Sequence, residues 1–188
     1  MTTRPTHAEP IILANALQQP SPNQDERPAD CVVDLLVIHN ISLPPGEFGG
    51  PWIDHLFRNR LDPSIHPFFQ TIHALRVSSH LLIHRDGRLI QYVPLNRRAW
   101  HAGKSNFRGR EQCNDFSIGI EMEGTDDQPY TDAQYARLSE VTAEIQVHFP
   151  GITQDRIVAH ADIAPGRKTD PGPYFDWQRY LGTLRHGT

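Results

Sequence analysis

The chain has 188 residues, of which 38% are hydrophobic and 21% are charged, and its formal net charge is -4. This length suits one domain with a single core, and the composition is that of an ordinary globular protein. The negative charge argues against non-specific binding of nucleic acid, which requires a basic surface. No apolar run approaches the roughly 20 residues needed to span a bilayer. We therefore expect neither a nucleic acid nor a membrane as partner.

The N-terminal segment and the cysteines bear on the cellular compartment. Residues 11–16 contain a match to a small-residue cleavage site, but the apolar run there is far shorter than the roughly 7–15 residues of a signal-peptide core. The chain has only two cysteines, whereas secreted disulfide frameworks usually have more. We expect a cytoplasmic protein with a polar, proline-rich lead-in segment (1–19) followed by one domain (20–188).

The first predicted strand is the apolar, β-branched run at 31–38, which is typical of a central strand buried on both faces. It should stop at His39. The long loop at 42–51 has no pattern of its own, and such loops are usually functional. Helical spacing then predicts short helices over 52–57 and 66–75.

The middle of the chain predicts a hairpin and a further strand. Residues 79–93 alternate around Asp86 and Gly87, a strong signal for a two-residue hairpin turn. Residues 98–114 read as a loop. The segment 116–123 alternates strictly between apolar and polar residues, which predicts a strand with one face on the core.

The C-terminal third predicts a long helix, a short strand and a last helix. Thr131 and Gln134 form a capping box at the start of the helix over 131–149. A short strand at 157–159 follows, and Asp176 should cap the helix over 177–184. Helices interleaved with strands, one hairpin included, indicate an α/β domain with a central mixed sheet flanked by helices.

The polar face of the 116–123 strand carries two carboxylates, Glu121 and Glu123, and two small residues, Ser117 and Gly119. A solvated strand face is the usual interpretation of such a pair of carboxylates. The small neighbours, however, should leave open space in front of a carboxylate. This favours a functional role for Glu121.

The segment 160–172 (H-A-D-I-A-P-G-R-K-T-D-P-G) cannot be a regular helix or a central strand, and shaped loops often carry chemistry. His39 and His160 each end a strand, at the sheet edge where open α/β sheets place ligands. Together with Asp170 they make a suitable zinc set with one position open, which indicates a catalytic metal site. Lys168 should face the same way as Asp170 if the loop is locally extended.

Spacing alone leaves these assignments open, because the chain has eleven histidines and most must be surface or core residues. His80 and His84 lie in the predicted hairpin and compete as candidates. Lys168 alone would normally be a solvated surface lysine. Trp100 would normally be a core residue.

Four runs in the chain are recognisable together: V-I-H-N-I-S-L-P-P-G-E-F-G-G-P-W-I-D (37–54), R-A-W-H-A-G (98–103), C-N-D-F-S-I-G-I-E-M-E-G-T-D (113–126) and R-K-T-D-P-G-P (167–173). They closely resemble the cytoplasmic 1,6-anhydro-N-acetylmuramoyl-L-alanine amidases of bacterial cell-wall recycling. These enzymes belong to a zinc amidase family that shares its fold with peptidoglycan recognition proteins. The resemblance covers nearly the whole chain in the same order.

The resemblance implies a zinc ion (Zn2+) held by His39, His160 and Asp170. It also implies cleavage of the amide bond between the lactyl group of anhydro-N-acetylmuramic acid and the L-alanine of the stem peptide. The partner is then a small-molecule muropeptide, and we expect a monomer. Glu121 matches the family's catalytic glutamate and Lys168 its catalytic lysine. Further positions match residues that contact the substrate or line its site: Asn40, Arg76, Trp100 and His101.

One position departs from the resemblance. Gln112 stands where some relatives have an arginine that meets a substrate carboxylate, and an amide cannot form that charged bidentate contact. Either Arg110 substitutes for it, or affinity for the peptide carboxylates is weaker in this chain.

Two other functions remain open. A catalytically inactive module that binds peptidoglycan fragments would lack a zinc ligand or the glutamate, and all of these match here. An amidase acting outside the cytoplasm on the intact wall would need a signal peptide, and the sequence predicts none.

Overall fold

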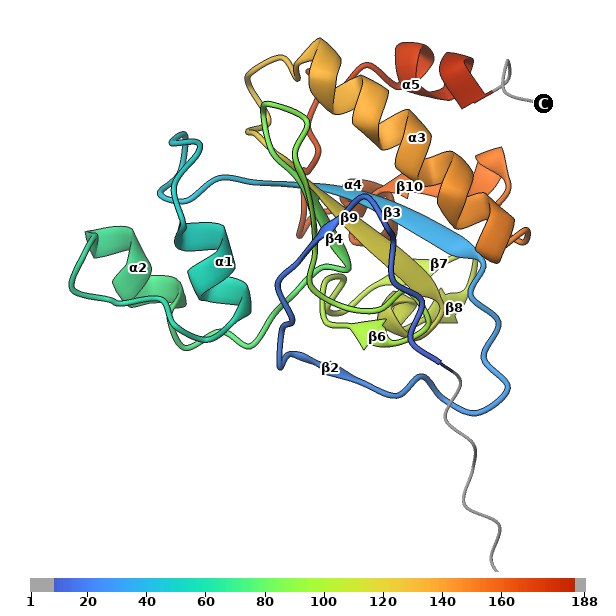
Figure 1. Cartoon of the computed structure of the whole chain (residues 1–188), viewed down its shortest axis with the longest axis horizontal. Coiled ribbons are helices and arrows are strands. Elements are labelled where there is room, and N and C mark those ends of the chain that lie inside the picture. The colour runs from blue at the N-terminus through green and yellow to red at the C-terminus, as the bar shows by residue number, and fades with distance from the viewer. Residues whose placement is uncertain (1–8, 185–188) are drawn as a thin grey trace, which may run out of the picture.

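A six-stranded mixed sheet forms the centre of the computed structural model, which describes residues 9–184 (Figure 1). Four neighbouring strands are parallel, and the hairpin adds an antiparallel strand beside them. The expected α/β class with a central mixed sheet is confirmed. Residues 1–8 of the expected lead-in and residues 185–188 lie outside the described part of the chain. The strand order is β1 (Leu17–Gln18), β5 (Leu89–Gln91), β4 (Leu81–Ile83), β9 (Ser117–Glu123), β3 (Leu35–Ile41) and β10 (Ile157–Ala159).

Strand β3 is buried on both faces, as its apolar run predicts. Leu36 and Ile38 pack into one hydrophobic cluster, whereas Leu35 and Val37 pack into another on the opposite face. The expected end of the strand at His39 is wrong, because β3 continues to Ile41. It continues because β9 pairs with it along its whole length, so that the backbone hydrogen bonds extend past the apolar run.

Two helices cover one face of the sheet (Figure 1): α3 (Asp132–His148) lies across it and α5 (Trp177–Leu184) packs beside α3. The predicted capping box of Thr131 and Gln134 is present at the start of α3. The Asp176 carboxylate accepts a hydrogen bond from the backbone N–H of Arg179, as expected of a helix cap. The apolar face of β9 packs under α3 in the largest core cluster.

The remaining elements are short. Helices α1 (Trp52–Phe57) and α2 (Pro67–Ile72) lie together at one side of the sheet (Figure 1), and α2 ends before the predicted 75. The hairpin of β4 and β5 is confirmed. The region 98–114, which was predicted as a loop, instead contains short segments that pair as strands. The other short elements are β2 (Gln24–Asp25), β6 (Arg98–Ala99), β7 (Asn106–Phe107), β8 (Arg110–Glu111), η1 (Cys113–Asp115), η2 (Gln154–Arg156) and α4 (His160–Ile163).

Part of the expected lead-in packs against the domain, because Leu13 is buried in the core and β1 pairs with β5. Among residues 9–184, none of the helices combines the length and the apolar character that crossing a membrane requires.

Candidate metal centre

Three parallel strands bring the candidate residues to one place. His39 on β3 lies directly opposite Glu121 on β9, and side chains at paired positions of parallel strands share a face. Ala159 on β10 pairs with Ile38, so His160 follows at the same edge as the first residue of α4. The segment after α4 then returns, and its Asp170 carbonyl accepts a hydrogen bond from the Ala161 N–H at 3.1 Å.

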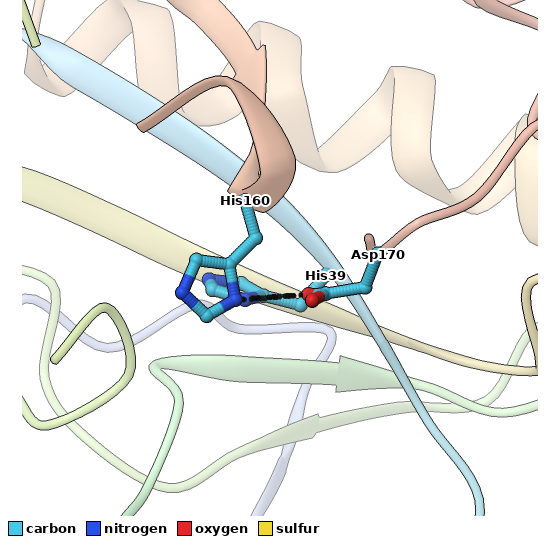
Figure 2. Close-up of side chains that lie close together, drawn as sticks. All are labelled: His39, His160 and Asp170. Carbon is cyan, nitrogen blue, oxygen red and sulfur yellow. Dashed lines mark hydrogen bonds and ion pairs between the residues drawn. The ribbon is translucent and has the colours of Figure 1, made fainter. Parts of the chain in front are cut away.

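Three side-chain atoms converge at this edge (Figure 2). The Nδ1 atoms of His39 and His160 are 2.9 Å apart, and Asp170 Oδ2 lies 3.2 Å from the first and 3.0 Å from the second. All three residues are buried. The short helix at 160–163 corrects the expectation that the whole segment 160–172 is irregular, because Pro165 and Gly166 come only after this turn.

The hydrogen bonds around the rings show that these atoms can hold a metal ion. His160 Nε2 lies 3.1 Å from the carbonyl oxygen of Ala102, and because a carbonyl only accepts, Nε2 carries the ring proton. With that proton on Nε2, an uncharged ring presents the lone pair of Nδ1. Burial lowers the pKa of His39 to about 4, against a smaller opposing effect of Asp170, so the imidazole of His39 is neutral near pH 7. Two imidazole nitrogens and one carboxylate oxygen suit zinc.

Glu121 and Lys168 lie beside these three residues in a cavity of about 380 Å³. Glu121 Oε2 is buried and has no hydrogen-bond partner among the described residues. Burial, and then the Asp170 carboxylate, raise the pKa of Glu121 well above its usual range. Lys168 is exposed, and it lines this cavity together with Asp170.

The rest of the cavity wall is partly apolar. Trp100 and His101 line it, and the indole N–H of Trp100 is buried without a partner among residues 9–184. Asn40 also lines it, but its amide donates to Asp126 Oδ1 at 2.7 Å and to the Pro171 carbonyl at 3.1 Å. Asn40 therefore braces the segment that carries Asp170. The apolar wall is formed by Leu43, Leu56, Phe57, Phe68, Ile72, Leu75 and Val77.

Two arginines that the sequence placed at the substrate are not brought to the cavity. Arg76 is exposed, and its Nη1 lies near the carbonyl oxygens of its own segment, 3.2 Å from that of Leu75. Arg110 pairs with Asp34 at 2.8 Å and stacks over the ring of Phe116 at 3.7 Å. Its guanidinium is therefore engaged elsewhere, and the geometry gives no support to the idea that it replaces the arginine missing at Gln112.

Glu121 faces a cavity, as expected of a carboxylate with open space in front of it, but the small residues beside it on β9 are themselves covered. The ring of His101 covers Gly119 so closely that a Cβ there would lie 2.5 Å from His101 Cγ. Ser117 Oγ lies 3.1 Å from His101 Nε2. Neither contact was predicted from the sequence. The small side chains signalled the close approach of another group, although not which one.

Glu123, the second carboxylate of β9, is neither solvated nor part of the cavity wall. It is buried, and its oxygens accept hydrogen bonds from the backbone N–H groups of Gly49 at 2.6 Å and Arg85 at 3.0 Å. His84 Nδ1 also contacts it at 3.0 Å. Glu123 therefore fixes the loop that follows β3, and His84 is engaged there rather than at the metal centre.

Comparison with known proteins gives concordant matches. The model of the N-acetylmuramoyl-L-alanine amidase family matches residues 27–173. The chain is 57% identical over 174 residues to the 1,6-anhydro-N-acetylmuramyl-L-alanine amidase AmpD of Haemophilus influenzae, covering 93% of this chain and 95% of that protein. It is 60% identical over 168 residues to AmpD of Escherichia coli, covering 89% of this chain and 91% of that one.

Solved structures agree with these matches. The fold is similar to the crystal structure of a selenomethionine derivative of AmpD, with a TM-score of 0.90 and 58% identity, covering 92% of this chain and 96% of that chain. It is also similar to Escherichia coli AmiD in complex with anhydro-N-acetylmuramic acid-L-Ala-D-γ-Glu-L-Lys. That match has a TM-score of 0.61 and 32% identity, covering 84% of this chain and 60% of that chain.

Proposed function

The chain belongs to the N-acetylmuramoyl-L-alanine amidase family, and from this premise we propose that it is a zinc-dependent hydrolase of 1,6-anhydro-muropeptides in cell-wall recycling. The bond cleaved joins the lactyl group of anhydro-N-acetylmuramic acid to L-alanine. The observation that carries the proposal is the convergence of His39, His160 and Asp170 beside Glu121, a carboxylate whose buried oxygen has no partner in the described part of the chain. The substrate bound in the AmiD structure supports a small-molecule muropeptide as partner.

Zinc would be held by His39, His160 and Asp170, and it would supply Lewis acidity in the cavity that these residues line. Glu121 Oε2 can accept a proton from the attacking water, because it has no hydrogen-bond partner among residues 9–184. Burial raises the pKa of Glu121 above its usual range, which favours retention of that proton until it is delivered to the leaving amine of L-alanine. Lys168 offers positive charge to the carbonyl oxygen as negative charge develops there.

Binding is assigned to the rest of the cavity. The indole N–H of Trp100, which has no partner among the residues that the structure describes, can donate to a polar group of the substrate. The apolar wall gives the sugar ring a surface to pack against. A cytoplasmic location and a monomeric state belong to the same proposal. The free thiols of Cys31 and Cys113 fit a reducing compartment.

The test uses the purified protein with two substrates, an anhydro-muropeptide and intact murein sacculi, each with and without a chelator. We expect chelator-sensitive release of peptide from the muropeptide, restored by added zinc. The variant Asp170→Ala should lose bound zinc and activity together, because it removes one of the three ligands. If neither substrate releases peptide in a chelator-sensitive way, the proposal is refuted.

The same experiment separates the alternatives. Binding of the muropeptide without release of peptide would support a recognition module. Release from intact sacculi at a rate similar to that from the muropeptide would support an amidase of the intact wall.

A further inference from the structure

We propose that His101 is a positioning residue that, together with Ser117, fixes the ring tautomer of His39 so that the Nδ1 lone pair of His39 faces the metal position. The inference rests on the proposed function, because it concerns how the same zinc ion is held. It assigns to His101 a role other than contact with the substrate. It also gives Ser117, which lies on the buried part of β9, a part in the metal centre.

A backbone carbonyl fixes the direction of the first hydrogen bond in this series. Ser117 Oγ lies 2.5 Å from the carbonyl oxygen of Cys113, and because a carbonyl only accepts, the hydroxyl must donate its single proton there. The same Oγ lies 3.1 Å from His101 Nε2. With its own proton committed, Oγ can only accept, so His101 Nε2 carries a proton and donates it.

The same reasoning identifies the donor in the contact between His101 and the metal ligand His39. A neutral His101 ring with a proton on Nε2 presents a lone pair at Nδ1, and this atom lies 2.9 Å from His39 Nε2. His39 Nε2 must therefore be the donor in this contact. His39 Nδ1 is then left without a proton, 3.2 Å from Asp170 Oδ2 and facing the metal position. Metal-ligating histidines generally donate their other N–H to such an orienting partner.

The His101 ring is held firmly enough to act in this way. Asn114 Oδ1 accepts hydrogen bonds from the backbone N–H groups of His101 at 3.1 Å and Ala102 at 2.7 Å. The ring lies flush against Gly119, where any Cβ would collide with it. His80 Nδ1 accepts from the Gly119 N–H at 3.0 Å, which fixes this stretch of β9 in turn.

The two ligand histidines are thus oriented by different means. His160 donates directly to the backbone carbonyl of Ala102, whereas His39 reaches a backbone carbonyl only through two side chains. A side-chain route can be interrupted by mutation without altering the backbone. The role of His101 can therefore be tested at Ser117, which does not line the cavity.

The first test compares Ser117→Ala with Ser79→Ala. Both serines are fully buried, and the Ser79 hydroxyl also donates to a carbonyl, that of Leu81 at 2.7 Å, but it takes no part in the route to the metal. The dissociation constant for zinc is measured in the absence of substrate by competition with a chromogenic chelator. We expect Ser117→Ala to weaken zinc binding about 10-fold, and Ser79→Ala to change it less than about twofold.

A second pair of variants keeps the inference testable if Ser117→Ala folds poorly. His101→Leu removes the acceptor for His39 Nε2, and zinc binding should weaken by about 10–100-fold. His101→Gln retains an amide oxygen that can accept this hydrogen bond, so it should recover part of the loss. The absorption spectrum of the cobalt-substituted protein should change in His101→Leu, because the orientation of one ligand ring is released.

Zinc binding at the wild-type affinity in both Ser117→Ala and His101→Leu would overturn the inference, even if turnover fell. Equal weakening by Ser117→Ala and Ser79→Ala would also overturn it, because the effect would then be general to buried serines. Failure of the proposed function is distinguishable. A protein that binds zinc with the expected differences but releases no peptide refutes the amidase proposal and leaves the positioning role intact.

Discussion

Replacing Glu121 with glutamine should remove most of the turnover and leave the zinc site intact. Glutamine has nearly the same shape, but it cannot take up a proton near neutral pH. Glu121 Oε2 makes no hydrogen bond in the described part of the chain, so the exchange breaks no contact of that atom. A positioned general base contributes about 10²–10⁴-fold to a rate, and kcat should fall by a factor in this range.

The same substitution should stabilise the metal-free protein. Burial, followed by the Asp170 carboxylate, raises the pKa of Glu121 well above its usual range. A carboxyl group with a higher pKa in the folded state binds more protons when folded, so it destabilises the fold increasingly as pH rises above its unfolded pKa of about 4.3. Glutamine removes the cost of burying this charge, which is about 1.4 kcal/mol for each unit by which the pKa is raised. For a chain of this length each kcal/mol raises Tm by about 2–4 °C.

Three measurements on Glu121→Gln and the wild type check the reasoning: kcat and KM on anhydro-muropeptide, bound zinc per chain, and Tm after removal of the metal at pH 5 and pH 8. The gain in Tm should be larger at pH 8. A variant that keeps more than about a tenth of kcat refutes the role as general base. Loss of zinc would reassign Glu121 to holding the metal, and an unchanged Tm at both pH values would refute the electrostatic argument.

Three further predictions concern neighbouring residues. Lys168→Ala should lower kcat more than it raises KM, because its contact strengthens in the transition state; a change confined to KM would make it a binding residue. Gly172→Ala should lower the free energy of unfolding by about 2 kcal/mol or more in a denaturant titration, since its φ is +81° and a Cβ would lie 2.4 Å from Asp126 Cα; an unchanged midpoint would contradict this. Burial alone would raise the pKa of Glu123, but hydrogen bonds from His84 and two backbone amides lower it overall, so this carboxylate stabilises the fold above pH about 4.3 and less as pH falls. Glu123→Gln should therefore lower the free energy of unfolding by about 1–3 kcal/mol at pH 7. In thermal melts, the difference in stability between the wild type and this variant should become smaller toward pH 3.

The elements that the sequence predicts well are those whose signals lie within the element. The capping box of Thr131 and Gln134 and the apolar stripe behind it specify α3 without reference to any other segment. The alternation of β9 likewise reveals which side chains meet the core. Because His39 and His160 follow apolar strand segments, their arrival at one edge of the sheet could also be anticipated.

Contacts between irregular segments could not be predicted, because no periodicity of apolar residues in the sequence specifies which loop crosses which strand. Gly119 and Ser117 are small enough to admit a group packed closely on β9, but only the path of residues 98–114 identifies that group as His101. The same limit explains Arg110, whose engagement with Asp34 depends on two loops meeting. A two-residue strand such as β1 is too short to show any alternation.

The pairing of His39 with Glu121 has a consequence for how activity appears during folding. These residues come from distant parts of the sequence, and their spacing is set by the hydrogen-bonded ladder between β3 and β9. Parallel pairing across such a long intervening chain forms slowly, because the conformational entropy of the loop is lost before the stabilising contacts form. A slip of one residue would send either side chain to the opposite face of the sheet. Catalytic competence should therefore appear only when the central sheet is complete, which would make turnover a sensitive reporter of correct strand register.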